Sequence, residues 1–298
     1  MKWLKNDERG QSLVLMAFGL TLFLGFVAFS IDLGWVIYHQ VKLDDAADLA
    51  VLSGAQSLPE NPVVAELSAR EVFTENYSTD TPIQNLLLIN GGNGVKIVYE
   101  YKVNLFFLPL LGKSDVTLSG ESEAVVEPVA MPGHIVPIAI NSITPMIPNV
   151  PIELVGDLND PSKGNFGLVD PTSDNSLGPN DFEYYIANDY KGEKGMPQAS
   201  EYIMTKTGSL GQHIKKGLDT RLAQGKNYIL CPVVDFSLVN GKTEVEILGY
   251  ARFKALVVTD LNGRHVTITG EFDEFIDTKA YANSIANYYG VKSVKLIK

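Results

Sequence analysis

A run of apolar residues without a charge, Ser12 to Ile31, dominates the hydrophobic pattern near the start of the chain. About 20 helical residues, at ~1.5 Å of rise each, cover the ~30 Å hydrocarbon core of a bilayer. The chain continues without proline through Gln56, so the pattern predicts one long helix over 11–56. Its first half is expected to cross a bilayer, because a helix pairs its own backbone polar groups there. Its second half is expected to protrude.

Charged residues on the two sides of this run predict its orientation. Basic residues precede the run and mostly acidic residues follow it: Lys2, Lys5 and Arg9 before, and Asp32, Lys42, Asp44, Asp45 and Asp48 after. Because basic flanks stay cytoplasmic, we expect the N-terminus inside and everything after Ile31 outside. A cleaved secretory signal and a buried globular helix are the alternatives. The first has a shorter apolar core, and the second needs a partner for every face of the run.

Small residues form a stripe on the protruding half of the helix. Ala46, Ala50 and Gly54 recur at every fourth position, and the neighbouring row repeats the spacing. Such a stripe lets another backbone approach closely. Its partner is either the protein's own domain or a helix of another subunit.

After residue 57 the pattern predicts an α+β head with antiparallel sheets and a few helices. A helix is expected over 63–77, with its apolar face formed by Val64, Leu67 and Val72. Strict alternation then predicts two strands, 95–103 and 116–126, joined by the apolar connector LFFLPLLGKSD. We expect these strands to pair antiparallel, with the helix packed on them.

The proline-rich stretch 128–161 is expected to hold only edge strands or linkers, such as 134–140 and 152–155, because proline cannot donate to a ladder. Two helices are predicted after it, over 180–190 with Asn180 as the N-cap and over 208–222.

The C-terminal region predicts a three-stranded meander with one buried face. Three β-rich runs between 228 and 275 are divided by Asn240-Gly241 and Asn262-Gly263, and Asn-Gly suits a tight hairpin turn. A helix over 279–289 and a short basic strand over 291–298 are expected to end the chain.

These elements predict four parts. They are a cytoplasmic lead over 1–10, the transmembrane and protruding helix over 11–56, an α/β hairpin sub-domain over 57–130, and a β-rich sub-domain over 131–298 that ends in the meander.

Composition excludes some classes of function. The net charge is −11, and no stripe of Lys and Arg is present, so a nucleic-acid partner is not expected. Cys231 is the only cysteine, so no disulfide forms within one chain. A buried thiol is the simplest interpretation, and an intermolecular bridge or a nucleophile are the alternatives.

No catalytic, cofactor-binding or metal-binding motif is found, and we expect none. The four histidines, His39, His134, His213 and His265, lack zinc-site spacing, and no phosphate-binding or hydrolase motif is present. One acidic, Gly/Pro-rich stretch has oxygen ligands that suit Ca²⁺: Asp157, Asn159, Asp160, Asp170 and Asp174. It lacks the glycine of an EF-hand loop, so a solvated turn is the better interpretation.

The N-terminal motifs resemble a known family. They are Arg9-Gly10 before the apolar run, Ile31-Asp32-Leu33-Gly34 at its end, and Lys42-Leu43, Asp45-Ala46-Ala47-Asp48-Leu49-Ala50 and Gly54-Ala55 beyond it. Together they resemble the Tad/Flp pilus-assembly TadG-like family, over about the first 55 residues.

The resemblance implies a bacterial envelope protein, a minor pilin-like or accessory component of a type IV-related Tad system. Several relatives are cut after Gly by a prepilin peptidase, which carried over gives the bond Gly10–Gln11. The usual Glu at the fifth mature position is Leu15 here.

The expected function is therefore a membrane-anchored, non-catalytic component of a Tad/Flp pilus or secretion system. Its expected partners are the lipid bilayer and other pilus or secretion-system subunits. Its expected location is the inner membrane, single-pass, with the N-terminus inside and the head extracytoplasmic, in or at the base of a pilus. The alternative is a surface-displayed binding or adhesion module that uses a pilin-like anchor.

Overall fold

The computed structural model describes residues 8–77, 83–155, 166–172, 174–206, 210–236, 242–261 and 265–297. The chain forms two compact units. The first unit comprises Met1–Val125 and Lys295–Lys298, and the second comprises Val126–Val294. The fold is α+β, as predicted: a long apolar N-terminal helix is followed by sheets and shorter helices.

The first unit begins with one uninterrupted helix, α1 (Glu8–Ala55), which confirms the predicted long helix. From Leu43 onward, one face of α1 is fully buried, and most of its residues are small. Their small side chains let helix α2 (Pro62–Asn76) and the sheet approach the helix backbone closely.

Helix α2 packs with a different face from the one predicted. Its buried residues are Ala65, Ala69 and Phe73, whereas Val64 and Leu67 are exposed. The reason is that α2 lies against the small-residue face of α1, where close backbone approach favours alanines over larger side chains. Phe73 also reaches the sheet, with its ring 6.2 Å from that of Tyr99.

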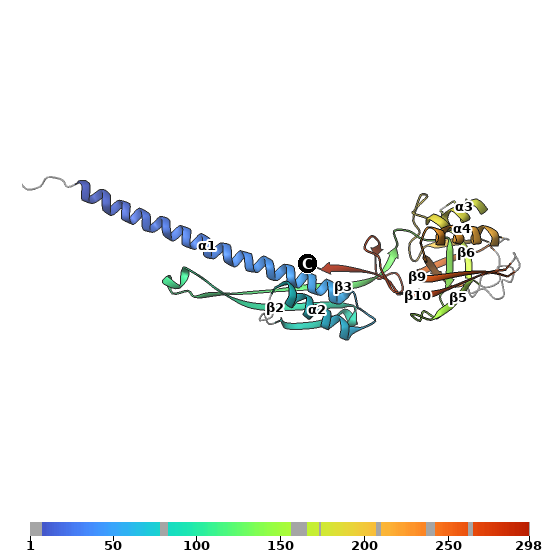
Figure 1. The fold of residues 1–298 in the computed structure, drawn as a ribbon, viewed down its shortest axis with the longest axis horizontal. Coiled ribbons are helices and arrows are strands. Elements are labelled where there is room, and N and C mark those ends of the chain that lie inside the picture. The colour runs from blue at the N-terminus through green and yellow to red at the C-terminus, as the bar shows by residue number, and fades with distance from the viewer. Residues whose placement is uncertain are drawn as a thin grey trace, which may run out of the picture. The chain divides into compact units, whose positions relative to one another are not determined.

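Three strands of a six-stranded sheet follow α2 and pair antiparallel: β1 (Ile83–Ile89), β2 (Gly94–Asn104) and β3 (Asp115–Met131). The pairing of β2 with β3 is the one predicted, with Val95 opposite Ala124 and Val103 opposite Val116. Strand β1 was not predicted; it pairs with β2 through a turn at η1 (Asn90–Gly92), in which three residues adopt positive φ. The β2–β3 hairpin extends beside α1, and its tip, which includes η2 (Leu108–Leu111), points toward the N-terminal half of the helix (Figure 1).

The second unit is built on a seven-stranded sheet in the order β5-β10-β9-β7-β6-β4-β8, in which β8 also pairs with β9. The strand bounds are β4 (Ile138–Asn141), β5 (Pro151–Val155), β6 (Phe166–Asp170), β7 (Tyr202–Lys206), β8 (Tyr228–Val234), β9 (Glu244–Leu261) and β10 (His265–Asp273). Strands β8, β9 and β10 are the three expected runs, and they pair antiparallel in that order. Both Asn-Gly pairs lie outside the described residues.

The meander buries both of its faces instead of one. Val245 and Ile247 belong to one core cluster, whereas Ala251 and Phe253 belong to another. A register shift in the β8–β9 pairing between Val233 and Val234 changes which face the alternating residues of β9 occupy. A one-residue slip moves every following side chain to the other face of the sheet. The alternating apolar residues of β9 therefore appear to share one face in the sequence, although they are buried on two different faces.

Two helices cover one face of this sheet: α3 (Pro179–Asn188) and α4 (Gly211–Ala223) (Figure 1). The predicted cap of α3 is wrong, since the N-cap is Gly178, whose N–H donates to the Asp181 carboxylate at 2.8 Å. Arg221 of α4 is fully buried and forms an ion pair with Asp189 at 2.7 Å. Its Nε also donates to the Tyr228 carbonyl at 2.6 Å, so one side chain joins α3, α4 and β8.

Three further expectations are wrong. Strand β4 is not an edge strand, because Pro137 precedes it and its own residues can all donate. The sheets are not wholly antiparallel, since β4 pairs parallel with β8, and β11 (Phe275–Ile276) pairs parallel with β13 (Val291–Ile297). Residues 279–289 form turns and the short strand β12 (Tyr281–Ala282) instead of the predicted helix. The local sequence contains no glycine and could form a helix, but pairing of β12 with β3 outweighs this local preference.

Substituting Gly54→Ala tests the close packing of α1. An added Cβ would lie 2.7 Å from the Ala65 carbonyl oxygen and 3.0 Å from the Ala69 Cβ. We expect a loss of about 1–3 kcal/mol in the free energy of unfolding, measured by denaturation in detergent.

The matched control is Gly34→Ala in the same helix, where nothing lies within 4 Å of the added carbon. This change should be neutral or stabilise the protein by up to ~1 kcal/mol. Equal effects of the two substitutions would contradict the packing.

Candidate functional site

The apolar half of α1 exposes its side chains on nearly all sides. From Gln11 to Ile31 only Ala28 is even half-buried. Within the described part of the chain, α1 is the one helix that is long and apolar enough to cross a membrane, and its most apolar stretch buries nothing. A helix that is apolar all round and unburied fits a lipid environment.

Asp32 ends this apolar run and is fully buried by the hairpin tip. Its Oδ1 accepts a hydrogen bond from the Phe106 N–H at 2.8 Å. Its Oδ2 accepts from the N–H groups of Phe107 at 3.0 Å and Leu108 at 2.7 Å. One carboxylate therefore fixes three successive amides of the tip beside the end of the apolar run, and charge-assisted bonds of this kind are the stronger ones.

An aromatic cluster follows Asp32 on the same side of α1. The Trp35 ring lies 4.4 Å from that of His39 and 5.3 Å from that of Phe106. The His39 ring stacks on Tyr101 at 6.0 Å, and its Nδ1 forms a hydrogen bond with the Tyr77 hydroxyl. A pocket of about 160 Å³ is lined by the rings of Tyr38, His39, Tyr77 and Tyr101, together with Lys42 and Asn76. Aromatic residues with polar atoms are enriched where membranes meet water.

Two more acidic residues of α1 bind the hairpin further along. The Tyr99 hydroxyl donates to Asp44 and accepts from the Gln40 amide at 3.0 Å. The Ser122 hydroxyl donates to Asp48 at 2.6 Å. Asp32, Asp44 and Asp48 thus hold the hairpin against α1 at three levels.

The predicted small-residue stripe is occupied by the protein itself. Ala46 and Ala50 are buried, and Gly54 lies against α2 and against Val95 of β2. Of the two partners considered for this stripe, these contacts support the protein's own domain.

Outside its buried face, the protruding helix carries exposed apolar side chains. Leu33, Ile37, Val41 and Leu49 are each about half exposed and are spaced by multiples of four residues. They continue the apolar surface of the first half of α1 beyond Asp32.

The candidate processing residues Gly10 and Gln11 lie in the first turns of α1, which begins at Glu8. Gln11 is exposed. Cleavage of the Gly10–Gln11 bond remains a prediction.

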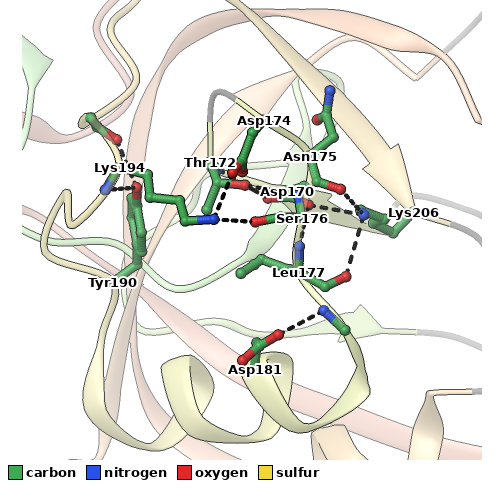
Figure 2. Close-up of polar contacts among 12 residues, drawn as sticks. Asp170, Thr172, Asp174, Asn175, Ser176, Leu177, Asp181, Tyr190, Lys194 and Lys206 are labelled. Carbon is green, nitrogen blue, oxygen red and sulfur yellow. Dashed lines mark hydrogen bonds and ion pairs between the residues drawn. The ribbon is translucent and has the colours of Figure 1, made fainter.

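In the second unit, a polar cluster surrounds Asp170 at the end of β6 (Figure 2). Asp170 is buried, and its carboxylate accepts from the Thr172 N–H at 3.0 Å, from the Thr172 hydroxyl and from the Leu177 N–H at 2.9 Å. Lys206 Nζ lies 2.9 Å from the same carboxylate. Lys194 approaches from the opposite side and binds Asp174 and Ser176, each at 2.6 Å.

The surroundings of Asp170 lower the pKa of its carboxyl group. Burial opposes ionisation, but the hydrogen bonds from Thr172, Lys206 and the Leu177 amide favour the charged form and outweigh it. The pKa of Asp174 also lies below its ordinary value, chiefly through Lys194 and Ser176. Both carboxylates are therefore charged at neutral pH and hold the loop as acceptors.

An open groove of about 400 Å³ lies beside this cluster. Its lining is mixed, with charged residues next to apolar ones: Asp170, Lys194, Glu201 and Glu244 with Pro171, Met196, Pro197 and Met204.

The other residues considered from the sequence are scattered. Cys231 is fully buried within a core cluster, and burial raises the pKa of its thiol. His213 pairs with Glu183 at 2.9 Å, and burial lowers the pKa of His134. In the part of the chain that the structure describes, no three His, Cys, Asp or Glu residues gather to hold a metal ion. Asp157, Asn159 and Asp160 lie outside that part, as does the side chain of His265.

Sequence reasoning missed the role of Asp32, although a signal was present. An acidic residue directly after an apolar run is costly unless it has partners, and the apolar connector 105–111 offered amides to it. The Asp170 cluster had no such signal, because Asp170 and Lys206 lie on different strands.

Comparison with known proteins identifies the N-terminal segment. Residues 10–57 match the family Tad, described as Flp pilus-assembly TadE/G-like. This match confirms the resemblance seen in the residues around Asp32 and Gly54, and it covers α1 with hardly any of the remaining chain. No curated protein and no solved structure matches the chain significantly.

Substituting Asp32→Ala should release the hairpin tip. The amides of Phe106, Phe107 and Leu108 would lose their acceptor, so we expect their hydrogen exchange to rise strongly in the detergent-solubilised protein. Asp45→Ala is the control, since Asp45 is exposed on the same helix. Unchanged exchange at 106–108 in the Asp32 variant would contradict the assigned role.

Substituting Asp170→Asn should destabilise the second unit by roughly 3 kcal/mol at neutral pH, because a buried acceptor of several donors loses its charge. Because folding lowers the pKa of Asp170 below that of an unfolded Asp (about 3.9), its contribution is present above about pH 4. It is lost as the pH falls through the lower, folded value.

The difference in unfolding free energy between wild type and Asp170→Asn should therefore shrink below about pH 4, which denaturation at several pH values measures. Asp174→Asn, in an exposed pair, should have a much smaller effect. A difference that grows with acid would refute the argument.

Proposed function

We propose that this chain is a membrane-anchored, surface-exposed accessory or minor pilin-like component of a Tad/Flp, type IV-related pilus or secretion system, with no catalytic role. One observation carries the proposal. The family match falls on α1, whose first half is apolar and unburied, whereas its second half packs on the chain's own sheet. The helix is therefore suited to connect a folded head to a bilayer.

The proposed topology is single-pass in the inner membrane. Basic residues precede the apolar run and acidic residues follow it, which favours a cytoplasmic N-terminus and an extracytoplasmic head. The protein would lie in the membrane or at the base of a pilus.

Contacts with other subunits would use the exposed face of α1. The stripe of Ala46, Ala50 and Gly54 already packs within the chain. Ile37 and Val41 lie on the face that remains open, and an apolar helix face is a usual helix-association surface.

Filament assembly tests the proposal. In a strain that lacks the gene, we expect no pili by electron microscopy, and the wild-type gene should restore them. The double variant Ile37→Asp/Val41→Asp should restore few or none, because two charges would have to be buried between helices.

Leu67→Asp is the matched control, since Leu67 is an exposed apolar residue on α2. It should support normal piliation. Normal pili in the strain without the gene would refute the assembly role, whereas failure of the double variant to reduce pili would refute only the contact face.

Processing after Gly10 is part of the same proposal. Mass spectrometry of the protein from these strains should find an N-terminus at Gln11. A protein that still begins before Gly10 would end the idea of cleavage.

A surface-displayed binding or adhesion module is the second candidate, favoured by the groove beside Asp170. It predicts intact pili and reduced attachment in the strain without the gene. The piliation count therefore separates the two candidates.

A further inference from the structure

The tip of the β2–β3 hairpin carries an exposed apolar surface at the level where α1 stops being apolar. Phe106 is 58%, Leu110 86% and Leu111 83% exposed. Phe107 is also exposed, and no acidic residue lies between 105 and 114. Exposed apolar clusters of this kind mark contact surfaces.

The strand that leads to the tip runs along α1 toward its apolar half. Val95 lies beside Gly54, Tyr99 bonds to Asp44 and Tyr101 stacks on His39. Each step along β2 therefore approaches the N-terminal half of the helix. At the end of this path the tip reaches Asp32, next to the last apolar residue of the run.

Most backbone N–H groups of the tip already have acceptors within the protein. The Asp32 carboxylate takes the N–H groups of 106–108. The N–H groups of Leu110, Gly112 and Lys113 donate to carbonyl oxygens within the tip at 3.1, 3.1 and 3.2 Å, and Pro109 has none. Unpaired amides are what exclude loops from apolar surroundings, so this tip avoids much of the cost of leaving water.

We propose that the hairpin tip, residues 106–111, inserts into the outer interface of the same bilayer that α1 crosses. Phe106, Leu110 and Leu111 enter the boundary between headgroups and acyl chains, as amphipathic surfaces do. Trp35 and Tyr38 lie at headgroup level, and Lys113 lies among anionic headgroups. We choose the membrane as the partner of the tip because the exposed apolar surface of the tip adjoins that of the apolar half of α1. This inference rests on the membrane anchor of the proposed function.

Site-directed fluorescence tests the insertion in the full chain. Leu110→Cys and Leu111→Cys, each with Cys231→Ser, are labelled with an environment-sensitive fluorophore. They are then reconstituted into vesicles of phosphatidylethanolamine and phosphatidylglycerol that contain spin labels at shallow or deep positions. We expect blue-shifted emission at both positions and the strongest quenching by shallow labels.

Labels at two further positions serve as references for the membrane interior and for water. Leu22→Cys, within the apolar run, should be quenched most by deep labels, and Leu67→Cys, exposed on α2, should stay unquenched with emission typical of water. If Cys231→Ser impairs folding, native Cys231 is kept, since it is fully buried.

Water-like emission at 110 and 111 together with deep quenching at 22 would overturn the insertion and leave the anchor intact. Absence of quenching at 22 would overturn the anchor itself. A blue shift at 110 without quenching by lipid labels would indicate a protein partner and would also overturn the insertion.

Discussion

The structure of the first unit depends on the point along α1 where the helix changes from being exposed on all sides to being packed against the rest of the unit. Up to Ile31, α1 exposes apolar side chains on all sides, and from Asp32 onward it must satisfy a buried carboxylate and pack on one face only. The first part of the helix is therefore suited to apolar surroundings on every side, and the second part is suited to packing against the head on one side. Asp32 lies at the change, and its bonds to 106–108 place the hairpin tip there.

Small side chains then determine how the head is built on the helix. Gly54 lets the Ala65 carbonyl approach to a distance that a side chain would block. Because α2 and β2 both share this face, Val64 and Leu67 of α2 remain exposed. The acidic residues Asp44 and Asp48 bond with Tyr99 and Ser122. Polar and apolar contacts thus alternate along one interface.

The sequence predicted elements whose signal is local and missed those set by tertiary contacts. The apolar run, the alternation in 95–103 and the three runs of the meander each carry their period within one segment. The strand 83–89 lacked clear alternation, and the 279–289 segment had helical composition but pairs with β3 instead. Asp170 and Lys206 meet only because β6 and β7 are neighbours in the sheet, which no spacing in the sequence records.

The orientation of the contacts between α1 and the hairpin has a mechanical consequence. Asp32, Asp44 and Asp48 bind successive levels of a hairpin that lies alongside the helix. Tension along the helix axis would load all three levels in shear at once, instead of opening them one after another. Resistance to forced separation follows the unfolding barrier more than equilibrium stability, so this arrangement favours resistance to a pull along the helix axis.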